Sequence, residues 1–255
     1  MDWSRAKTIL IFSFLLLDLF LGYFLWQQKK EQDSLGQVSQ LEQESIKKTL
    51  EERRIAVPED IPYDTPEMLY WTISPDSNKK IPVDPSQGKV EEGEEGVTVT
   101  FQSPHALPDP SQKRRFQEAI QKEFSLAGEY EYDPYLSTRG KMVYTQKIDG
   151  FSIFSSRLEL LLTDRGLEGY HITYTKAEGK GAPRKMISAY SALSVLVENG
   201  LIRSGERVEE VKAGYYQERY DQELKLLVPV WRVVHTGGIH YVNGFIGTVV
   251  ETKEE

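Results

Sequence analysis

The four histidines are the residues from which a metal site could be built, because the chain contains no cysteine. His235 and His240 flank the Gly237-Gly238 pair, so a hairpin turn there would bring the two imidazoles close together. Two imidazoles without a nearby carboxylate motif make a poor zinc site, and His105 and His171 stand at no recognised ligand spacing. The absence of cysteine also excludes disulfides and thiolate catalysis. The sequence therefore predicts no metal site.

Other patterns for enzymatic chemistry are equally weak. The chain contains neither a G-x-S-x-G motif nor a Walker loop, and residues 178–183, EGKGAP, lack the full phosphate-binding pattern despite their glycines and lysine. Carboxylates such as Glu159 and Asp164 cannot be assigned general acid and base roles from spacing alone. Because a catalytic site needs a constellation of groups and none is legible, the sequence predicts no enzymatic activity, no catalytic residue and no cofactor.

One stretch, residues 8–26, is apolar enough to enter a bilayer. As an α-helix it would extend about 28 Å, close to the roughly 30 Å of hydrocarbon that a spanning helix must cross. A cleaved secretory signal is the alternative, but no small-residue cleavage triplet follows the run, and Trp26 suits a membrane interface. Arg5 and Lys7 precede the span, which favours a cytoplasmic N-terminus, residues 1–7, and an outside location for the rest of the chain.

Asp18 lies near the midplane of this span, where inserting a charged carboxylate costs roughly 2.5–3.5 kcal/mol. At helical spacing it shares a face with Phe14, Leu15, Leu21 and Gly22. A glycine one turn from a polar side chain lets a second helix approach closely while the carboxyl group hydrogen-bonds across. The face is therefore predicted to be a docking site for another transmembrane helix. The alternative is that Asp18 stays neutral or is hydrated through a local bilayer defect.

Apart from this span the composition is that of an ordinary globular protein, with 39% hydrophobic and 27% charged residues. Lys and Arg number 31 against 39 Asp and Glu, which gives a net charge of −8. This acidic balance argues against nucleic acid as a partner and against adhesion of the soluble part to anionic lipid. Contact with the lipid bilayer is therefore expected through the one helix.

Residues 27–57 indicate a juxtamembrane stalk helix, because apolar residues recur at loosely helical spacing among many charges. The apolar stripe is irregular, Gly36 interrupts it, and heptads are not sustained. A signalling stalk and a solvated spacer both remain open. Pro58, Pro62 and Pro66 then end any helix and mark the start of the globular part.

Two strand-like runs open the globular part, MLYWTI at residues 68–73 and VTVTF at residues 97–101. The Pro-, Gly- and acid-rich residues 74–96 between them predict a long loop, and pairing of the two strands is plausible. No function is attached to the EEGEEG run in this loop, because such charge runs are usually just solvated.

A helix followed by antiparallel strands is predicted twice, with residues 176–183 as a spacer. The first helix has Asp109 as its N-cap and Phe116, Ile120 and Phe124 on its apolar face, and the strands that follow it begin at residues 142, 157 and 169. The second helix spans residues 184–199 and ends before Gly200. The strands that follow the second helix begin at residues 208, 224 and 239. This pattern predicts an α+β fold with helices packed on antiparallel sheet, as two repeated halves, residues 58–175 and 176–255. Pro229 is predicted to place its strand at an edge or to make a bulge. An edge could bind a partner by strand addition, although a merely blunted edge is the more usual explanation for a proline in a strand.

Three stretches together resemble the YycH/YycI family of membrane-anchored regulators in Gram-positive bacteria: MDWSRAKTILIF with the span that follows, ISAYSALSVLVENGLI, and LLVPVWRVVHTGGIHYVNGFIG. The resemblance covers most of the chain, and its motifs are structural. It implies an extracytoplasmic domain and a single transmembrane helix that act together with YycH on the essential sensor histidine kinase WalK (YycG), which governs cell-wall metabolism. It also implies an α+β domain resembling parts of YycH.

The ending of the chain is similar to the strand-turn-strand close of PepSY-type modules. That likeness implies structural roles for Trp231, Tyr241, Asn243, Gly244 and Gly247. The leading interpretation is a non-catalytic membrane-anchored regulator of a sensor kinase. A PepSY-type protease inhibitor or propeptide-like module is the alternative, and a cell-wall hydrolase comes third. Kinase regulation should fail when the native span is exchanged, whereas an inhibitor should work as a soluble domain and a hydrolase should cleave wall polymers.

Overall fold

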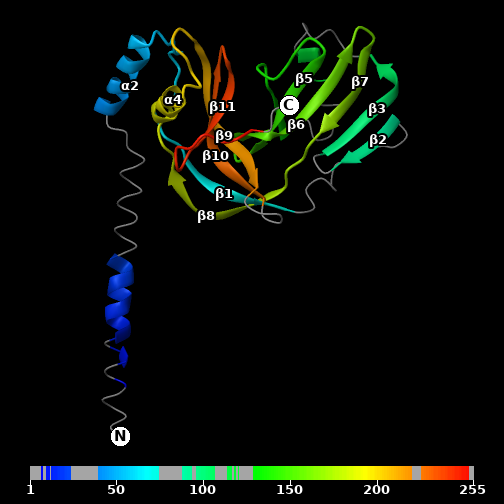
Figure 1. Ribbon diagram of the computed structural model, residues 1–255. Helices are drawn as coiled ribbons and strands as arrows, with labels where there is room; N and C mark the ends of the chain where they lie inside the picture. Colours follow the sequence, from blue (N-terminus) through cyan, green and yellow to red (C-terminus); the bar gives the residue numbers. More distant parts are fainter. Residues whose placement is uncertain are drawn as a thin grey trace.

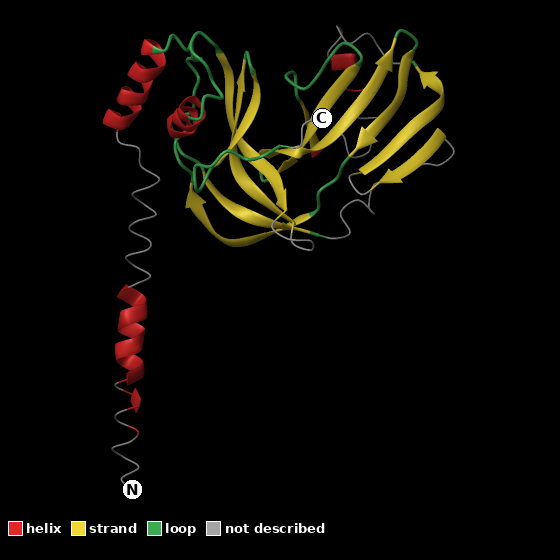
Figure 2. Ribbon diagram, viewed as in Figure 1, coloured by secondary structure: helices red, strands yellow, loops and turns green. Residues whose placement is uncertain are grey.

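The computed structural model describes residues 7, 10–11, 13–23, 40–74, 88–93, 96–106, 114–116, 118, 120, 129–219 and 225–252. It has mixed α and β structure built on one large, mainly antiparallel sheet, whose strands form two lobes (Figures 1 and 2). Between named strands of the described chain, every pairing is antiparallel except that of β6 with β9. The predicted α+β class is confirmed.

Each lobe collects strands that are mostly close in sequence. The first lobe contains β2 (Gly88–Gly93), β3 (Gly96–His105), β4 (Tyr130–Tyr132), β5 (Lys141–Ile148), β6 (Phe151–Thr163) and β7 (Gly166–Ile172). The second lobe contains β1 (Glu67–Ile73), β8 (Ala177–Lys185), β9 (Val208–Arg219), β10 (Lys225–His235) and β11 (Gly238–Asn243), together with helices α2 (Gln40–Glu52) and α4 (Ala189–Glu198). The lobes join where β6 runs parallel to β9, through the pairs Ser152↔Gly214 and Ile153↔Tyr215.

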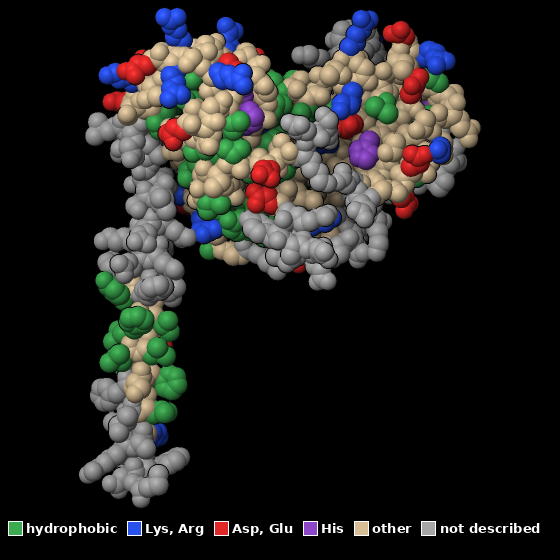
Figure 3. Space-filling view, viewed as in Figure 1, with side chains coloured by type: hydrophobic (Ala, Val, Ile, Leu, Met, Phe, Trp, Pro, Cys, Tyr) green, Lys and Arg blue, Asp and Glu red, His purple; other side chains and the backbone are tan. Residues whose placement is uncertain are grey.

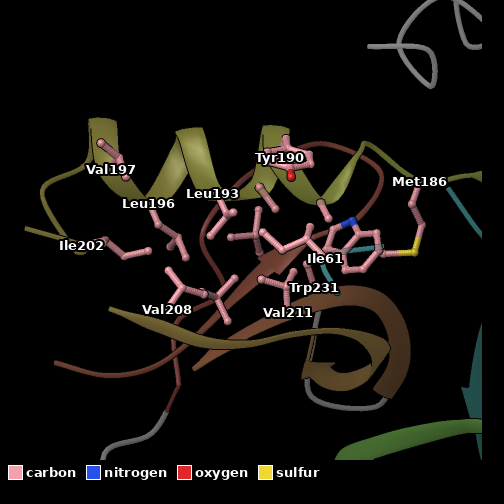
Figure 4. Packing of buried hydrophobic residues seen from close by; sticks show 14 of the residues in the cluster. Ile61, Met186, Tyr190, Leu193, Leu196, Val197, Ile202, Val208, Val211 and Trp231 are labelled. Carbon is pink, nitrogen blue, oxygen red and sulfur yellow. The ribbon is translucent and has the colours of Figure 1, made fainter. Parts of the chain in front are cut away.

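The core of the second lobe lies between α4 and the sheet (Figure 4). Ser188 caps α4 by accepting a 3.0 Å hydrogen bond from the amide of Ser191, and Gly200, at φ +70°, follows the last turn. Leu193 and Leu196 are fully buried over Trp231, whose indole N–H donates to the carbonyl of Ile187 at 2.8 Å. Full burial of each such leucine contributes about 1.5–3 kcal/mol. This burial holds α4 in place, as the apolar face of the predicted second helix requires.

The core of the first lobe is separate from that of the second. Phe116 and Ile120, two of the described helical positions of the predicted first helix, are buried against strands β3, β6 and β7. Asp109 and Phe124 lie outside the described residues. Each lobe therefore has helical residues on its strands, although β1, from the predicted first half, belongs to the second lobe. An origin of the two halves as repeats stays a prediction.

Three expectations about strands are wrong. β1 does not pair with β3; it lies between β10 and β8, whereas β3 lies between β2 and β7. The predicted loop 74–96 contains the strand β2, and the predicted spacer 176–183 belongs mostly to β8. In both cases, pairing with a regular neighbouring strand overrides the weak strand propensity of glycine-rich sequence. For the same reason α4 begins at Ala189 and not at residue 184, since Lys185 still pairs with β1.

The edge prediction for Pro229 is also wrong, because β10 lies inside the sheet between β9 and the strands β1 and β11. The carbonyl of Pro229 accepts a 2.8 Å hydrogen bond from Gly244, on the β11 side. In a strand the N and the carbonyl of one residue point to the same side. The missing N–H of Pro229 therefore falls where β10 changes partner, from β1 at Leu227 to β11 at Val230. A strand addition site at this proline is not available.

The predicted span, residues 8–26, is described at positions 10–11 and 13–23, which are helical, and the other positions lie outside the described residues. Within the part of the chain that the structure describes, we find no helix with both the length and the apolar character needed to cross a membrane.

Candidate functional site

Helix α2 links the N-terminal segment to the second lobe, and it is docked rather than solvated. Leu50, only 1% exposed, and Ile46 of α2 pack into the same core cluster as α4. The helix ends in a Schellman motif, with Ile55 N–H donating to the Leu50 carbonyl at 2.8 Å and Arg54 N–H to the Glu51 carbonyl at 2.9 Å. Ile55 is buried beside Leu50. Of the two alternatives for this stretch, a solvated spacer does not describe α2.

A cation that lies near two aromatic rings adds to the contact between α2 and α4. The ammonium of Lys47 lies 4.8 Å from the centroid of the Tyr63 ring and 5.1 Å from that of Tyr190, and it donates to the Tyr63 hydroxyl. That hydrogen bond raises the pKa of Lys47. The two tyrosine rings meet edge to face at 6.1 Å. Because Tyr190 belongs to α4 and Tyr63 to the segment after α2, the three side chains connect both helices.

The chain leaving α2 is bonded to the loop that follows α4. Gly205 N–H donates to the carbonyl of Arg53 at 3.1 Å, and Ala56 N–H donates to that of Glu206 at 3.1 Å. The carbonyl of Ala56 in turn accepts from Val208 at 2.8 Å, at the start of β9. We call residues 53–56, loop 203–207 and the hairpin turn 235–238 the stalk joint. A displacement of α2 therefore acts on these bonds as well as on the packing of α2 against the core.

The carboxylate of Glu206 ties the joint to the β10–β11 hairpin. It accepts from the amide of Arg203 at 3.1 Å and lies 2.9 Å from Nδ1 of His235. The bond from Arg203 is the main cause that lowers the pKa of Glu206, and His235 adds to it. As predicted, the Gly237-Gly238 turn brings the histidines together: the rings of His235 and His240 stack at 5.1 Å. Burial, and then the neighbouring His235, lower the pKa of His240.

The other two histidines lie in the first lobe. His105 stacks on Phe101 at 3.9 Å, and Nδ1 of His171 is 2.9 Å from the hydroxyl of Thr98. Among the described residues, no group of three histidines, aspartates or glutamates is placed to hold a metal ion.

A buried ion network fixes the two lobes to each other. Arg232 of β10 contacts Asp133, in the segment between β4 and β5, and donates to Glu210 of β9 at 2.5 and 3.1 Å. The side chains of Arg232 and Asp133 are each 2% exposed. Burial alone would lower the pKa of Arg232, but the two carboxylates outweigh it and raise the pKa. The guanidinium also lies 4.5 Å from the ring centroid of Phe154.

The predicted docking face of the N-terminal helix is placed in the described segment 13–23. Phe14, Leu15 and Leu21 are 58%, 53% and 48% exposed, and Asp18 is exposed too. A Cβ added to Gly22 would meet nothing within 4 Å. Apolar side chains gather along the visible face of this segment (Figure 3). The role of these five residues in docking stays a prediction. The stalk joint is a second candidate site that the sequence alone did not indicate.

A family model described as YycI protein matches residues 34–245, which is most of the chain. The chain belongs to the YycI family. This match includes α2, both lobes and the stalk joint. It confirms the resemblance found in the sequence.

Comparison with curated proteins finds no match. Among solved structures, the chain is similar to an uncharacterized protein from Eubacterium rectale at 11% identity and a TM-score of 0.39, covering 62% of this chain and 67% of that one. It is similar to the YpeB C-terminal domain of Bacillus megaterium at 11% identity and a TM-score of 0.42, covering 85% and 97%. It is also similar to YycH from Bacillus subtilis at 9% identity and a TM-score of 0.45, covering 75% of this chain and 59% of YycH.

Proposed function

We propose that this chain is a non-catalytic, membrane-anchored regulator of an essential sensor histidine kinase of the WalK (YycG) type, in a two-component system that controls cell-wall metabolism. It acts together with a YycH-like protein. The observation that carries this proposal is the match of residues 34–245 to the YycI family. Contacts are made by the transmembrane helix, residues 8–26, and by the extracytoplasmic domain.

The stalk joint gives the regulator a physical route from the membrane to the domain. A regulator anchored by one helix must transmit a displacement through whatever follows that helix. Here the next described helix, α2, packs on α4, and residues 53–56 directly after it are bonded to loop 203–207, so its position is coupled to the second lobe. The coupling follows from packing and hydrogen bonds, and it requires no ligand or reaction.

The proposed topology has residues 1–7 in the cytoplasm, residues 8–26 in the membrane, and the stalk 27–57 and both halves of the domain outside. Protease added to intact protoplasts should then remove the domain, while an epitope on the N-terminus stays protected. Full protection of the domain, or a mature chain that begins after the span, would show that this topology is wrong.

The docking face predicts how variants of the span should behave. Asp18→Leu should weaken capture of the kinase or of the YycH-like protein from membranes while improving insertion, because it removes a midplane polar group. Asp18→Asn should largely keep capture, since an amide still hydrogen-bonds across helices, with intramembrane bonds averaging about 0.6 kcal/mol. Gly22→Ile should block the same face by its bulk.

The measurement is co-purification of the kinase and of the YycH-like protein, together with expression of genes under that kinase. Wild-type capture and signalling in both Asp18→Leu and Gly22→Ile would refute the docking face. The soluble domain without its span distinguishes kinase regulation from the alternative function, a PepSY-type protease inhibitor. If the soluble domain alone reproduced the activity by inhibiting a protease, the kinase proposal would fail.

A further inference from the structure

The turn that follows β11, residues 243–248, holds an apolar side chain in solvent. Ile246 is 66% exposed, more than any other large hydrophobic side chain of the described residues outside the N-terminal helix. The buried side chain of Asn243 fixes the turn, because its Oδ1 accepts from the amides of Phe245, at 3.0 Å, and Ile246, at 3.3 Å. Gly247 N–H donates to the Asn243 carbonyl at 2.9 Å. The turn is therefore built to keep Ile246 outside the core.

The turn lies at the end of the second lobe where the chain arrives from the N-terminal segment. The ammonium of Lys47, in the middle of α2, lies over the ring of Tyr190, at the start of α4. The guanidinium of Arg53, just after α2, donates to the carbonyl of Val197, near the end of α4, at 3.3 Å. The two helices therefore run in the same direction, and α2 begins at the N-terminal end of α4. At that end Ile187, just before α4, donates its amide to the turn at 2.6 Å.

The side chains around Ile246 are of the kinds that membrane interfaces collect. The guanidinium of Arg184 lies 4.4 Å from the ring centroid of the half-buried Phe245. Tyr63, which packs on Tyr190 at the same end of α4, is 60% exposed. Tyrosine and arginine combine an apolar body with a polar tip, so both are favoured where acyl chains meet water. The tip of Ile246 supplies the apolar group that enters the acyl chains.

The small size of this surface decides between a bilayer and a separate protein as its partner. A specific protein interface buries at least about 1,000 Å² in total, which one isoleucine and its neighbours do not offer. A bilayer that already holds the same chain makes no such demand, because tethering gives a high effective concentration. The predicted span ends at Trp26 and α2 begins at Gln40, so the chain between them reaches at most about 50 Å.

We propose that this end of the second lobe rests on the outer surface of the bilayer, with Ile246 inserted at the boundary of headgroups and acyl chains. The inference rests on the proposed function, which places the span in that bilayer and the lobes outside. Glu67 of β1 lies opposite Lys185 at the end of β8, so the positive charge there is opposed. The contact is therefore apolar and does not depend on anionic lipid. It fixes the tilt of the second lobe, and of the docked α2, relative to the membrane.

A single-cysteine probe tests the contact, because the chain contains no cysteine of its own. The full chain, labelled with bimane, is placed in nanodiscs of phosphatidylcholine with brominated acyl chains and compared with the same lipid without bromine. A label at Thr248→Cys, exposed on the turn, should be quenched by bromine. A label at Ser204→Cys, exposed in loop 203–207 at the opposite end of the lobe, should not be quenched. Leu17→Cys, in the predicted span, is the positive reference.

Variants at Ile246 show whether its side chain makes the contact. Ile246→Asp, in the chain labelled at Thr248→Cys, should lower the quenching to the level at Ser204→Cys, because a carboxylate does not enter the acyl chains. Ile246→Leu should leave the quenching unchanged. Because Ile246 is exposed, both variants should keep the fold. Replacing half of the lipid with phosphatidylglycerol should also leave the quenching unchanged, and quenching that requires this anionic lipid would overturn an apolar contact.

The reference at Leu17→Cys separates the contact from the proposed topology. If it is quenched while the label at Thr248→Cys behaves like that at Ser204→Cys, the contact is wrong and the topology stands. If Leu17→Cys is not quenched, the proposed topology fails and the contact fails with it. A label at Thr248→Cys that is shielded from iodide in water, yet is not quenched by brominated lipid, would show that protein covers the turn, such as a second copy of the chain. That result would also overturn the proposal.

Discussion

Replacing Asp133 with alanine is expected to destabilise the folded chain by about 3–5 kcal/mol, because it leaves the buried guanidinium of Arg232 without its most buried counter-charge. Glu210 alone cannot compensate, since its side chain is 25% exposed and shares its charge with water. The loss should appear as a lower midpoint, with unchanged slope, in denaturant unfolding of the purified full chain.

Three further variants separate the ion network from simple loss of packing. Asp133→Asn should cost less than Asp133→Ala, because the amide oxygen still accepts from Arg232. Removing both partners, as Asp133→Leu with Arg232→Met, should recover most of the stability, since apolar replacements of a buried pair are often neutral. Glu91→Ala is the control at an exposed pair, with Lys89 and Glu91 75% and 61% exposed, and it should change stability by less than about 0.5 kcal/mol. A cost below about 1 kcal/mol for Asp133→Ala would contradict a network that holds the lobes together.

The sequence predicts well those features that are decided by neighbours along the chain. The turn between β10 and β11 follows from two adjacent glycines, and its register places His240 opposite Val233, close to His235. The end of α4 follows from Gly200, which adopts the positive φ that stops a helix. The apolar face of α4 follows from helical spacing alone.

Features decided by distant residues escape sequence reasoning. Asp133 and Arg232 are 99 positions apart, and neither stands in a pattern that marks it as buried. β8 is a strand because β1 pairs with it, although its own residues include three glycines or prolines in a short run, from Gly179 to Pro183. The contacts of Glu206 also depend on the fold, because its own loop 203–207 meets residues 53–56 and the hairpin turn 235–238. A single sequence carries no signal for such meetings, since each depends on the whole topology.

Leu50→Asp should have the largest effect on function outside the span, because it places a carboxylate in the contact between α2 and α4. Truncating a buried leucine already costs about 2–5 kcal/mol, and a charge at the same place costs more. α2 joins the core through one face and ends at Glu52, before residues 53–56 bond to loop 203–207, so we expect the helix to detach while the sheet stays folded. If the substitution lowers the free energy of α2 docking by about 3 kcal/mol, the α2 amides should lose roughly a hundredfold in protection from hydrogen exchange.

Two matched variants make the Leu50→Asp result specific. Thr49→Asp adds the same charge at an adjacent exposed position, and Leu50→Met keeps an apolar side chain of similar volume, so both should leave α2 docked. With α2 detached, the anchor and the folded lobes remain in one chain but no longer move together. Expression of the kinase-controlled genes should therefore resemble that of cells lacking the whole protein, although the kinase is still captured through the intact span. If Leu50→Asp exposes the α2 amides yet leaves gene expression at the wild-type level, the stalk joint transmits nothing, and regulation must pass through the span alone.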